Sequence, residues 1–203
     1  MHLKLIFLLL IINSLMYSQN REKLFNEDIS FKYEIKKDQH NTIGVIGSAG
    51  RQAYATFIEN NGPEKNQQYF QHIKFTSTNL GKKPSEIYLC IYENNNGLPG
   101  NIIDGAKFLV RIPALTTFII ADLSQLKIKV PVDGYFLGFE WLLEQENEIK
   151  GNTSTSNLPY NPTIKGYTGN KVNLYSKHKE WRKESDTNFV AGLALEISYI
   201  PNL

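Results

Sequence analysis

The chain is a succession of short apolar runs separated by polar turns, and this pattern limits its fold more than any other feature. The densest part, residues 73–141, contains IKFTSTNL, SEIYLCIY, AKFLVRI, TTFIIADL and GYFLGFEWLL. Several runs alternate apolar and polar side chains, which is typical of half-buried β-strands. No run sustains the period of an amphipathic helix. The pattern predicts an all-β fold, a single antiparallel β-sandwich of the jelly-roll or Greek-key type.

Alternation also assigns side chains to faces. In the run that starts at Gly134, the residues Tyr135, Leu137, Phe139 and Trp141 share one face, while Glu140 lies opposite with Phe136 and Gly138. A charge inside a strand needs a partner, and Arg111 or Lys74 is expected to supply it. The long C-terminal run, residues 188–200, alternates throughout and is expected to pair with a strand far away in the sequence.

Other segments suggest local connections. Residues 42–59 contain Gly44, Gly47 and Gly50 without the spacing of a phosphate-binding loop, and they predict a glycine-rich hairpin. AKFLVRI and TTFIIADL are expected to pair through Pro113. The segment ENNNGLPGN is expected to be a turn. Residues 144–186 are polar and predict a long surface excursion, in which only TIKGY and KVNLY resemble strands.

The N-terminal segment has the order of a secretory signal peptide. Lys4 precedes an apolar run at residues 5–12, and a short polar segment follows. The run is too short to span a bilayer, which needs roughly 20 apolar residues. Cleavage after Ser18 would leave residues 19–203 as one exported domain with Gln19 at its N-terminus, located in the periplasm or outside the cell. No membrane span is expected in this mature chain.

Charge and cysteine content exclude some classes of protein. Removal of residues 1–18 takes away one lysine and no acidic residue, so the formal net charge falls from +2 to +1. Such a balance does not favour a nucleic-acid partner. Cys90 is the single cysteine, so no intramolecular disulfide can form and packing must stabilise the fold. Its apolar neighbours predict a buried, inert thiol.

A family resemblance lies in two consecutive segments, IKFTSTNLGKKPSEIYLCIYENNNGLPGNII and IIADLSQLKIKVPVDGYFLGFEWL. They resemble β-sandwich domains of secreted or outer-membrane-associated proteins of the Bacteroidota, which often occur with carboxypeptidase-like regulatory domains. The shared marks are the IY pair at residues 91–92, GLPGNII at 97–103, DLS at 122–124 and FLGFEWL at 136–142. The resemblance covers roughly residues 51–143 and implies export and a sandwich fold, without catalytic residues. No regulatory domain precedes the sandwich in this chain.

The sequence contains no recognisable catalytic motif. The histidines at positions 40, 72 and 178 lie in separate polar contexts without zinc-ligand spacing, and no GxSxG elbow occurs. The protein is therefore expected to be non-enzymatic and to need no cofactor. Oxygen-rich side chains between Glu93 and Asp104 leave a calcium site as an open question.

Aromatic residues in the polar stretch suggest a ligand platform. Trp181 lies in a highly charged segment, and Tyr160, Tyr167 and Tyr175 lie nearby in the sequence. Exposed aromatic rings that stack on sugar faces are typical of carbohydrate-binding sandwiches, so these four residues and Glu140 are candidate glycan-binding residues. The alternatives are a divergent glycan-active hydrolase using Glu140 or Glu144, and a structural subunit that binds a cell-surface protein through a sheet edge.

Overall fold

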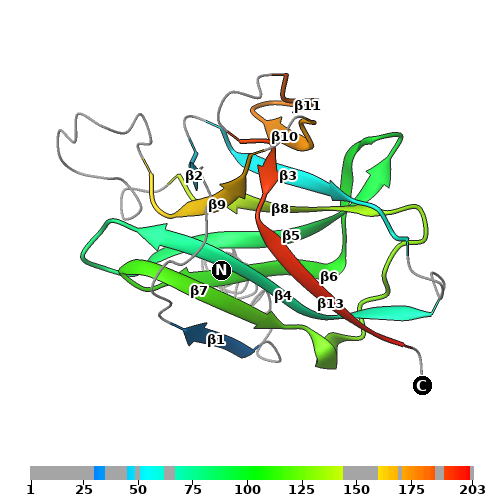
Figure 1. The fold of residues 1–203 in the computed structure, drawn as a ribbon, viewed down its shortest axis with the longest axis horizontal. Coiled ribbons are helices and arrows are strands. Elements are labelled where there is room, and N and C mark those ends of the chain that lie inside the picture. Colours follow the sequence, from blue (N-terminus) through cyan, green and yellow to red (C-terminus); the bar gives the residue numbers. More distant parts are fainter. Residues whose placement is uncertain are drawn as a thin grey trace, which may run out of the picture.

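The computed structural model confirms the all-β prediction, because the chain forms two antiparallel sheets that pack on each other (Figure 1). It describes residues 30–34, 45–48, 51–61, 67–143, 160–168, 171–185 and 190–201. Within these ranges the helical element is one 3-10 turn, η1 (Ser124–Leu126). No helix in the described part of the chain is long and apolar enough to cross a membrane.

One sheet has seven strands in the described residues. Its order is β1–β7–β4–β9–β12, with β13 paired to β4 and β2 paired to β9. The strands are β1 (Ser30–Glu34), β2 (Val45–Ile46), β4 (Gln68–Asn79), β7 (Leu115–Asp122), β9 (Thr163–Tyr167), β12 (Gly192–Leu193) and β13 (Leu195–Pro201).

The other sheet has six described strands in the order β11–β10–β3–β8–β5–β6. They are β3 (Ala53–Ile58), β5 (Ser85–Asn95), β6 (Leu98–Ile112), β8 (Tyr135–Trp141), β10 (Leu174–Lys177) and β11 (Trp181–Lys183). The chain crosses between the two sheets repeatedly, as it does in Greek-key and jelly-roll sandwiches.

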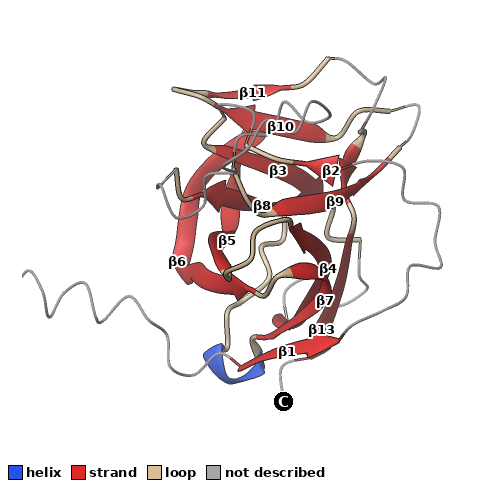
Figure 2. Ribbon diagram, turned by 90° about the vertical axis from the view of Figure 1, so that its left-hand side faces the viewer, coloured by secondary structure: helices blue, strands red, loops and turns tan. Residues whose placement is uncertain are grey.

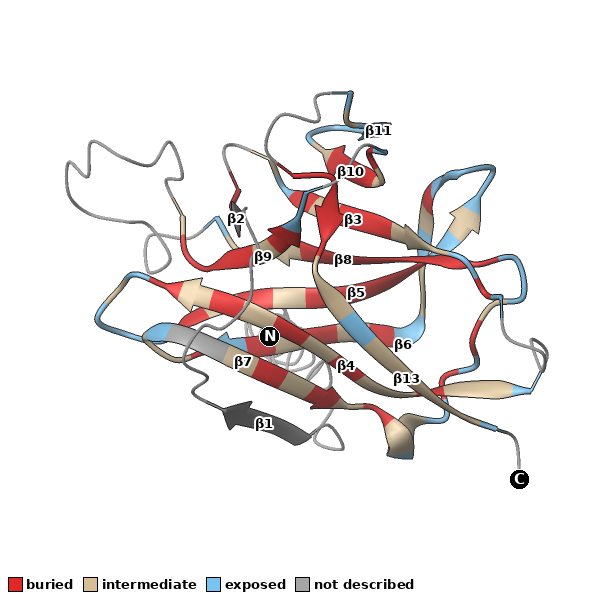
Figure 3. Cartoon of the chain, viewed as in Figure 1, coloured by how far each residue is buried: buried red, intermediate tan, exposed pale blue. Residues whose placement is uncertain are grey.

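The core lies between the sheets and is built from inward-facing side chains of strands in both (Figure 3). Phe75 of β4 and Phe139 of β8 meet there with ring centroids 4.8 Å apart. Each fully buried side chain of this size stabilises the fold by about 1.5–3 kcal/mol. Glu140 lies on the opposite face from the row that ends at Trp141, as alternation predicts.

The predicted turn at residues 93–101 is a tight hairpin between β5 and β6. Only Asn96 and Gly97 form the turn, with φ angles of 53° and 84°. Two successive positive φ angles are characteristic of a type I′ turn, for which Asn-Gly is the favoured pair. Asn94 Oδ1 accepts a hydrogen bond of 2.9 Å from the Gly97 N–H and supports the turn.

Two predicted local pairings are wrong. The glycine-rich segment is not a hairpin, because β2 pairs with β9 whereas β3 pairs with β8 and β10 in the other sheet. AKFLVRI and TTFIIADL also separate, since β6 pairs with β5 and β7 pairs with β4 and β1. Pro113 has no N–H to donate, and Leu115 has a φ of 78°, so the chain turns across the sandwich at this point.

The polar stretch at residues 144–186 is only partly a surface excursion. Its described residues supply β9 to the seven-stranded sheet, and β10 and β11 to an edge of the six-stranded sheet. Ile164 and Leu174 are buried in the core, and Trp141 Nε1 donates a hydrogen bond of 2.7 Å to the Pro162 carbonyl oxygen. These few apolar residues are buried because their strands pair with distant strands, which local composition does not reveal.

The C-terminal run pairs non-locally, as expected, but in two parts. β12 pairs with β9, and β13 pairs with β4. The run divides at Ala194, whose N–H donates a hydrogen bond of 3.0 Å to the Lys165 carbonyl oxygen.

Candidate functional site

The six-stranded sheet is curled, so that its two edge strands, β6 and β11, come into contact. In Figure 2, β6 bends from the side of the sandwich toward β10 and β11. The curl encloses the face of the sheet that points away from the core. Side chains on this face form a second cluster, which we call the outer cluster: Ala55, Phe57, Tyr88, Cys90, Tyr92, Ile102, Phe136, Tyr175 and Trp181.

Glu140 lies beside the outer cluster, and both of its carboxylate oxygens have partners. Lys107 Nζ donates a hydrogen bond of 2.6 Å to Oε2, and the Tyr92 hydroxyl donates one of 2.9 Å to Oε1. The prediction that Arg111 or Lys74 is the partner of Glu140 is therefore wrong. Lys107 reaches Glu140 because it lies opposite Cys90 in the pairing of β6 with β5. On its other side, β5 pairs with β8, the strand that carries Glu140.

The enclosed position changes the acid–base behaviour of this network. Burial raises the pKa of the Cys90 thiol to about 12, and the negative charge of Glu140 adds to the increase. Burial also raises the pKa of Tyr92, with further contributions from Cys90 and Glu140. For Lys107, burial acts to lower the pKa, but the hydrogen bond and charge of Glu140 outweigh it and the pKa is raised. Cys90 is thus a buried, protonated thiol, in agreement with the sequence-based interpretation.

Trp181 packs on the outer cluster. Its ring meets Tyr92 edge-on with centroids 5.2 Å apart, and Lys177 Nζ lies 5.8 Å from the Trp181 ring centroid. The Trp181 side chain is half-buried and lies outside the lining of the cavity beside Tyr167. Tyr160, another candidate, is half-buried against the main core and also lies outside the lining of that cavity.

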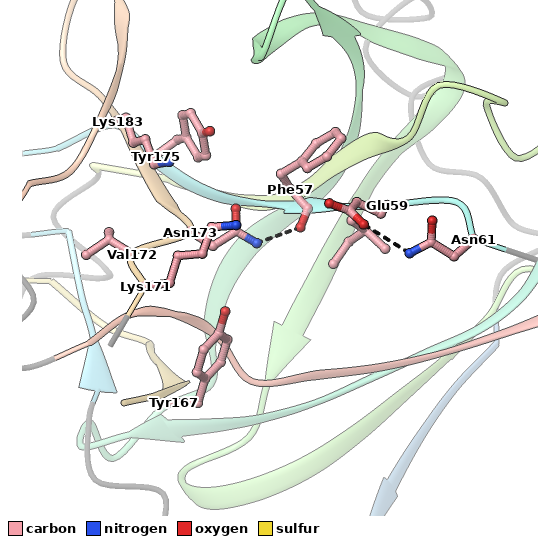
Figure 4. Close-up of a pocket in the computed structure, with 10 residues that line it drawn as sticks. Phe57, Glu59, Asn61, Tyr167, Lys171, Val172, Asn173, Tyr175 and Lys183 are labelled. Carbon is pink, nitrogen blue, oxygen red and sulfur yellow. Dashed lines mark hydrogen bonds between the residues drawn. The ribbon is translucent and has the colours of Figure 1, made fainter. Parts of the chain in front are cut away.

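A cavity of about 700 Å³ lies where the end of β3 meets β9 and the segment leading into β10 (Figure 4). Ligand pockets in proteins measure about 300–1,000 Å³. Two predicted candidates, Tyr167 and Tyr175, both line it. The full lining is Phe57, Ile58, Glu59, Asn61, Tyr167, Lys171, Val172, Asn173, Tyr175 and Lys183.

Tyr167 is the accessible aromatic ring of this cavity. Its side chain is 37% exposed, and in Figure 4 its hydroxyl points toward Lys171 and Asn173. The ring lies against Gly192, its cross-strand neighbour, where an added methyl group would come within 2.6 Å of the hydroxyl oxygen. Tyr175 is 7% exposed and forms a wall, with its ring 4.8 Å from that of Phe136.

Polar side chains surround the aromatic rings. Asn173 Nδ2 donates a hydrogen bond of 2.8 Å to the Phe57 carbonyl oxygen, which fixes the amide at the cavity. Asn61 Nδ2 donates one of 3.0 Å to Glu59 Oε2. The contributions of Gly192 and Asn173 were not predicted from the sequence, because β12 and the segment before β10 reach this site only through long-range pairing.

A serine, a histidine and an aspartate lie side by side on the outer face of the seven-stranded sheet. Ser198 Oγ is 3.1 Å from His72 Nδ1, and His72 Nε2 is 3.7 Å from Asp122 Oδ2. The three are direct neighbours on adjacent antiparallel strands, where such contacts follow from the register alone. The 3.7 Å separation is longer than the hydrogen bond that orients a catalytic histidine. We interpret the row as a cross-strand polar ladder.

The hairpin at residues 93–104 carries the oxygen-rich side chains that could form a calcium site. The amides there support the turn: Asn94 Nδ2 donates to the Asp133 carbonyl oxygen at 3.0 Å, and Asn96 Nδ2 donates to Asn95 Oδ1 at 3.3 Å. Across the residues whose positions are described, no three His, Cys, Asp or Glu side chains are grouped to hold a metal ion.

Comparison with known proteins yields one distant likeness. No family model and no curated protein match the chain. Among solved structures, the clostridial cysteine protease Cwp84 after propeptide cleavage is similar over 78% of this chain, with 10% sequence identity and a TM-score of 0.47. The similar region spans 36% of that protein's chain. Similarity at this level does not bear on activity.

Proposed function

We propose that this protein is an exported, non-enzymatic β-sandwich module that binds glycans in the cavity beside Tyr167. The exposed Tyr167 ring, backed by Gly192 at the edge of a cavity of about 700 Å³, is the observation that carries the proposal. An aromatic ring held against backbone on one side offers its remaining surface to the apolar face of a sugar. Its two rotatable bonds lose little entropy when a ligand binds.

The polar lining supports the same ligand class. Sugar hydroxyls need donors and acceptors at fixed positions, and amides and carboxylates provide both. Asn173 is held by the Phe57 carbonyl oxygen, and Asn61 holds the Glu59 carboxylate. These groups face Tyr167 across the cavity in Figure 4. A ring and hydrogen-bonding groups on opposite walls suit a pyranose, which is apolar on its faces and polar at its rim.

The positions of the acidic residues favour binding over hydrolysis. A glycosidase of the usual type needs two carboxyl groups about 5–9.5 Å apart on either side of the bond that it cleaves. Glu59 is the single carboxylate among the described residues of the cavity lining. Glu140, one of the two candidate acids of the hydrolase alternative, is hydrogen-bonded to Lys107 and Tyr92 beside the outer cluster. The other, Glu144, lies outside the described residues.

Binding to a set of glycans tests the proposal. The chain is expressed with its own N-terminal segment, collected as the secreted form, screened on immobilised glycans and measured by calorimetry. Tyr167→Ala should abolish binding, and Tyr167→Phe should retain most of it. Leu80→Ala removes another exposed apolar side chain, 61% exposed, from outside the cavity lining and should bind as the parent does.

Either of two results would overturn the proposal: no glycan binds the parent protein, or Tyr167→Ala binds as well as the parent. Capture of a cell-surface protein in the absence of any glycan binding would favour the structural-subunit alternative. A thermal melt of each variant shows whether the fold is intact.

A further inference from the structure

We infer that the glycan recognised in this cavity is acidic and carries a carboxylate or sulfate group that faces Lys171 and Lys183. This inference rests on the proposed glycan-binding function and names its ligand class. Both lysines are exposed and line the cavity. Lys171 lies in the segment that leads into β10, and Lys183 ends β11, so two separate segments supply positive charge to one site.

Neither lysine forms an ion pair with another residue that the structure describes. Ion pairs between described residues include Arg51–Glu184, His72–Asp122, Lys74–Glu196 and Lys107–Glu140, and none of these four involves Lys171 or Lys183. Lys183 Nζ lies over the Tyr175 ring, 5.8 Å from its centroid. Two cations at one cavity, neither paired with a described carboxylate, favour a ligand that brings its own negative charge.

The charges in the cavity are also separated in space. In Figure 4 the lysines lie on the side of β10 and β11, whereas Glu59 and Asn61 lie on the opposite side, beyond the end of β3. The anionic group of the sugar is therefore placed toward the lysines, and neutral hydroxyls toward Glu59. An acidic group in the reverse orientation would face the Glu59 carboxylate, which disfavours that binding mode.

Lysine suits this ligand class because its ammonium group is a compact charge that pairs with carboxylate or sulfate without a fixed geometry. A charge-assisted hydrogen bond at an exposed site is expected to increase affinity by about tenfold. Because both lysines are exposed, the preference should weaken as salt is added.

The test compares three oligosaccharides of equal length by calorimetry: an oligogalacturonide, a sulfated galactan fragment and a neutral galactan fragment. The parent protein is measured at low and high salt beside two double variants. One is Lys171→Met with Lys183→Met. The other, Lys82→Met with Lys83→Met, removes the same charge from the exposed turn after β4, outside the cavity lining.

The parent protein should bind at least one acidic fragment about tenfold more tightly than the neutral one. The cavity variant should lose that preference, while the turn variant keeps it. Equal affinity for the three fragments, or an unchanged preference in the cavity variant, would overturn the inference and leave the glycan-binding proposal in place. No binding to any fragment, with the same result on the wider glycan screen, would overturn both. Comparison of the two acidic fragments identifies the anionic group.

Discussion

The rings of Trp181 and Tyr92 meet edge-on with centroids 5.2 Å apart and an interplanar angle of 77°. In the order of the six-stranded sheet, three strands separate β11 from β5, so a flat sheet would hold these rings far apart. Their contact requires the curl that also brings β11 against β6. Trp181 therefore closes the outer cluster over Tyr92.

We predict that Trp181→Ala destabilises the fold without loss of glycan affinity. The half-buried ring and its contacts with Tyr92 and Lys177 should contribute about 2 kcal/mol to the free energy of unfolding, measured by urea titration. Trp181→Phe keeps an aromatic edge and should lose less. Unchanged stability together with lost glycan binding would instead support Trp181 as the sugar platform expected from the sequence.

The Lys107–Glu140 pair should stabilise the protein more than an exposed pair does. The two side chains are 34% and 20% exposed, and their atoms approach to 2.6 Å. A double-mutant cycle with Lys107→Met and Glu140→Gln is predicted to give a coupling energy of about 1–2 kcal/mol. The more exposed Lys74–Glu196 pair, at 3.7 Å, is the control and should give a value close to zero. Equal coupling in the two cycles would contradict the prediction.

Properties that depend on the alternation of side chains along one strand could be predicted from the sequence. Phe139 faces the core while Glu140 faces away, and Cys90 is buried with an unreactive thiol. These predictions succeed because they depend on residue type and period, which a single strand carries in its own sequence.

Properties that depend on register between distant strands could not be predicted. Glu140 is paired with Lys107 because register shifts in the β5–β6 hairpin set which β6 residue lies opposite Cys90. Tyr167 meets Gly192 only through the pairing of β9 with β12. Composition groups Trp181 with Tyr167, whereas the curl of the sheet brings the Trp181 ring against Tyr92. Local sequence does not predict these three contacts, because each contact depends on how two distant segments align in the fold.

Export is predicted to depend on the N-terminal apolar run, which lies outside the described residues. A protein expressed with this segment in a Gram-negative host should leave the cytoplasm and begin at Gln19, which the intact mass of the exported form shows. Leu8→Arg with Leu9→Arg interrupts the apolar run, and should keep the uncleaved chain inside the cell. An exported chain of full-length mass would contradict cleavage after Ser18.

Gly192→Ala is predicted to impair the glycan site more than the fold. The added methyl group would lie 2.6 Å from the Tyr167 hydroxyl oxygen and 2.7 Å from its ring carbons, so the ring must swing away. Glycan affinity should fall by about tenfold or more, while the free energy of unfolding falls by about 1 kcal/mol. Calorimetry and urea titration on one preparation separate the two effects. Full affinity in this variant would show that Gly192 does not position Tyr167.

Stability is predicted to fall at alkaline pH, with Cys90 contributing first. Its pKa rises from the ordinary value of 9.0 to about 12 in the folded state, because burial and Glu140 disfavour the thiolate. Above pH 9 the unfolded chain releases this proton while the folded protein keeps it, so this group should lower the free energy of unfolding by about 1 kcal/mol per pH unit between pH 9 and pH 11.

Cys90→Ala isolates the contribution of the thiol. The variant loses packing and starts from a lower stability, but its slope between pH 9 and 10 should be smaller than that of the parent by about 1 kcal/mol per pH unit. Tyr135, whose pKa burial also raises from 10.0, adds to the slope of both proteins at higher pH and cancels in the comparison. The pKa of Tyr92 is raised by burial and in part by Cys90, so the comparison is made between pH 9 and 10, below the pH at which most tyrosine of the unfolded chain ionises. Urea titrations at pH 8, 9, 10 and 11 supply the slopes. Identical slopes in parent and variant would show that the folded protein ionises Cys90 as readily as the unfolded chain does, which its burial and the adjacent Glu140 carboxylate both oppose.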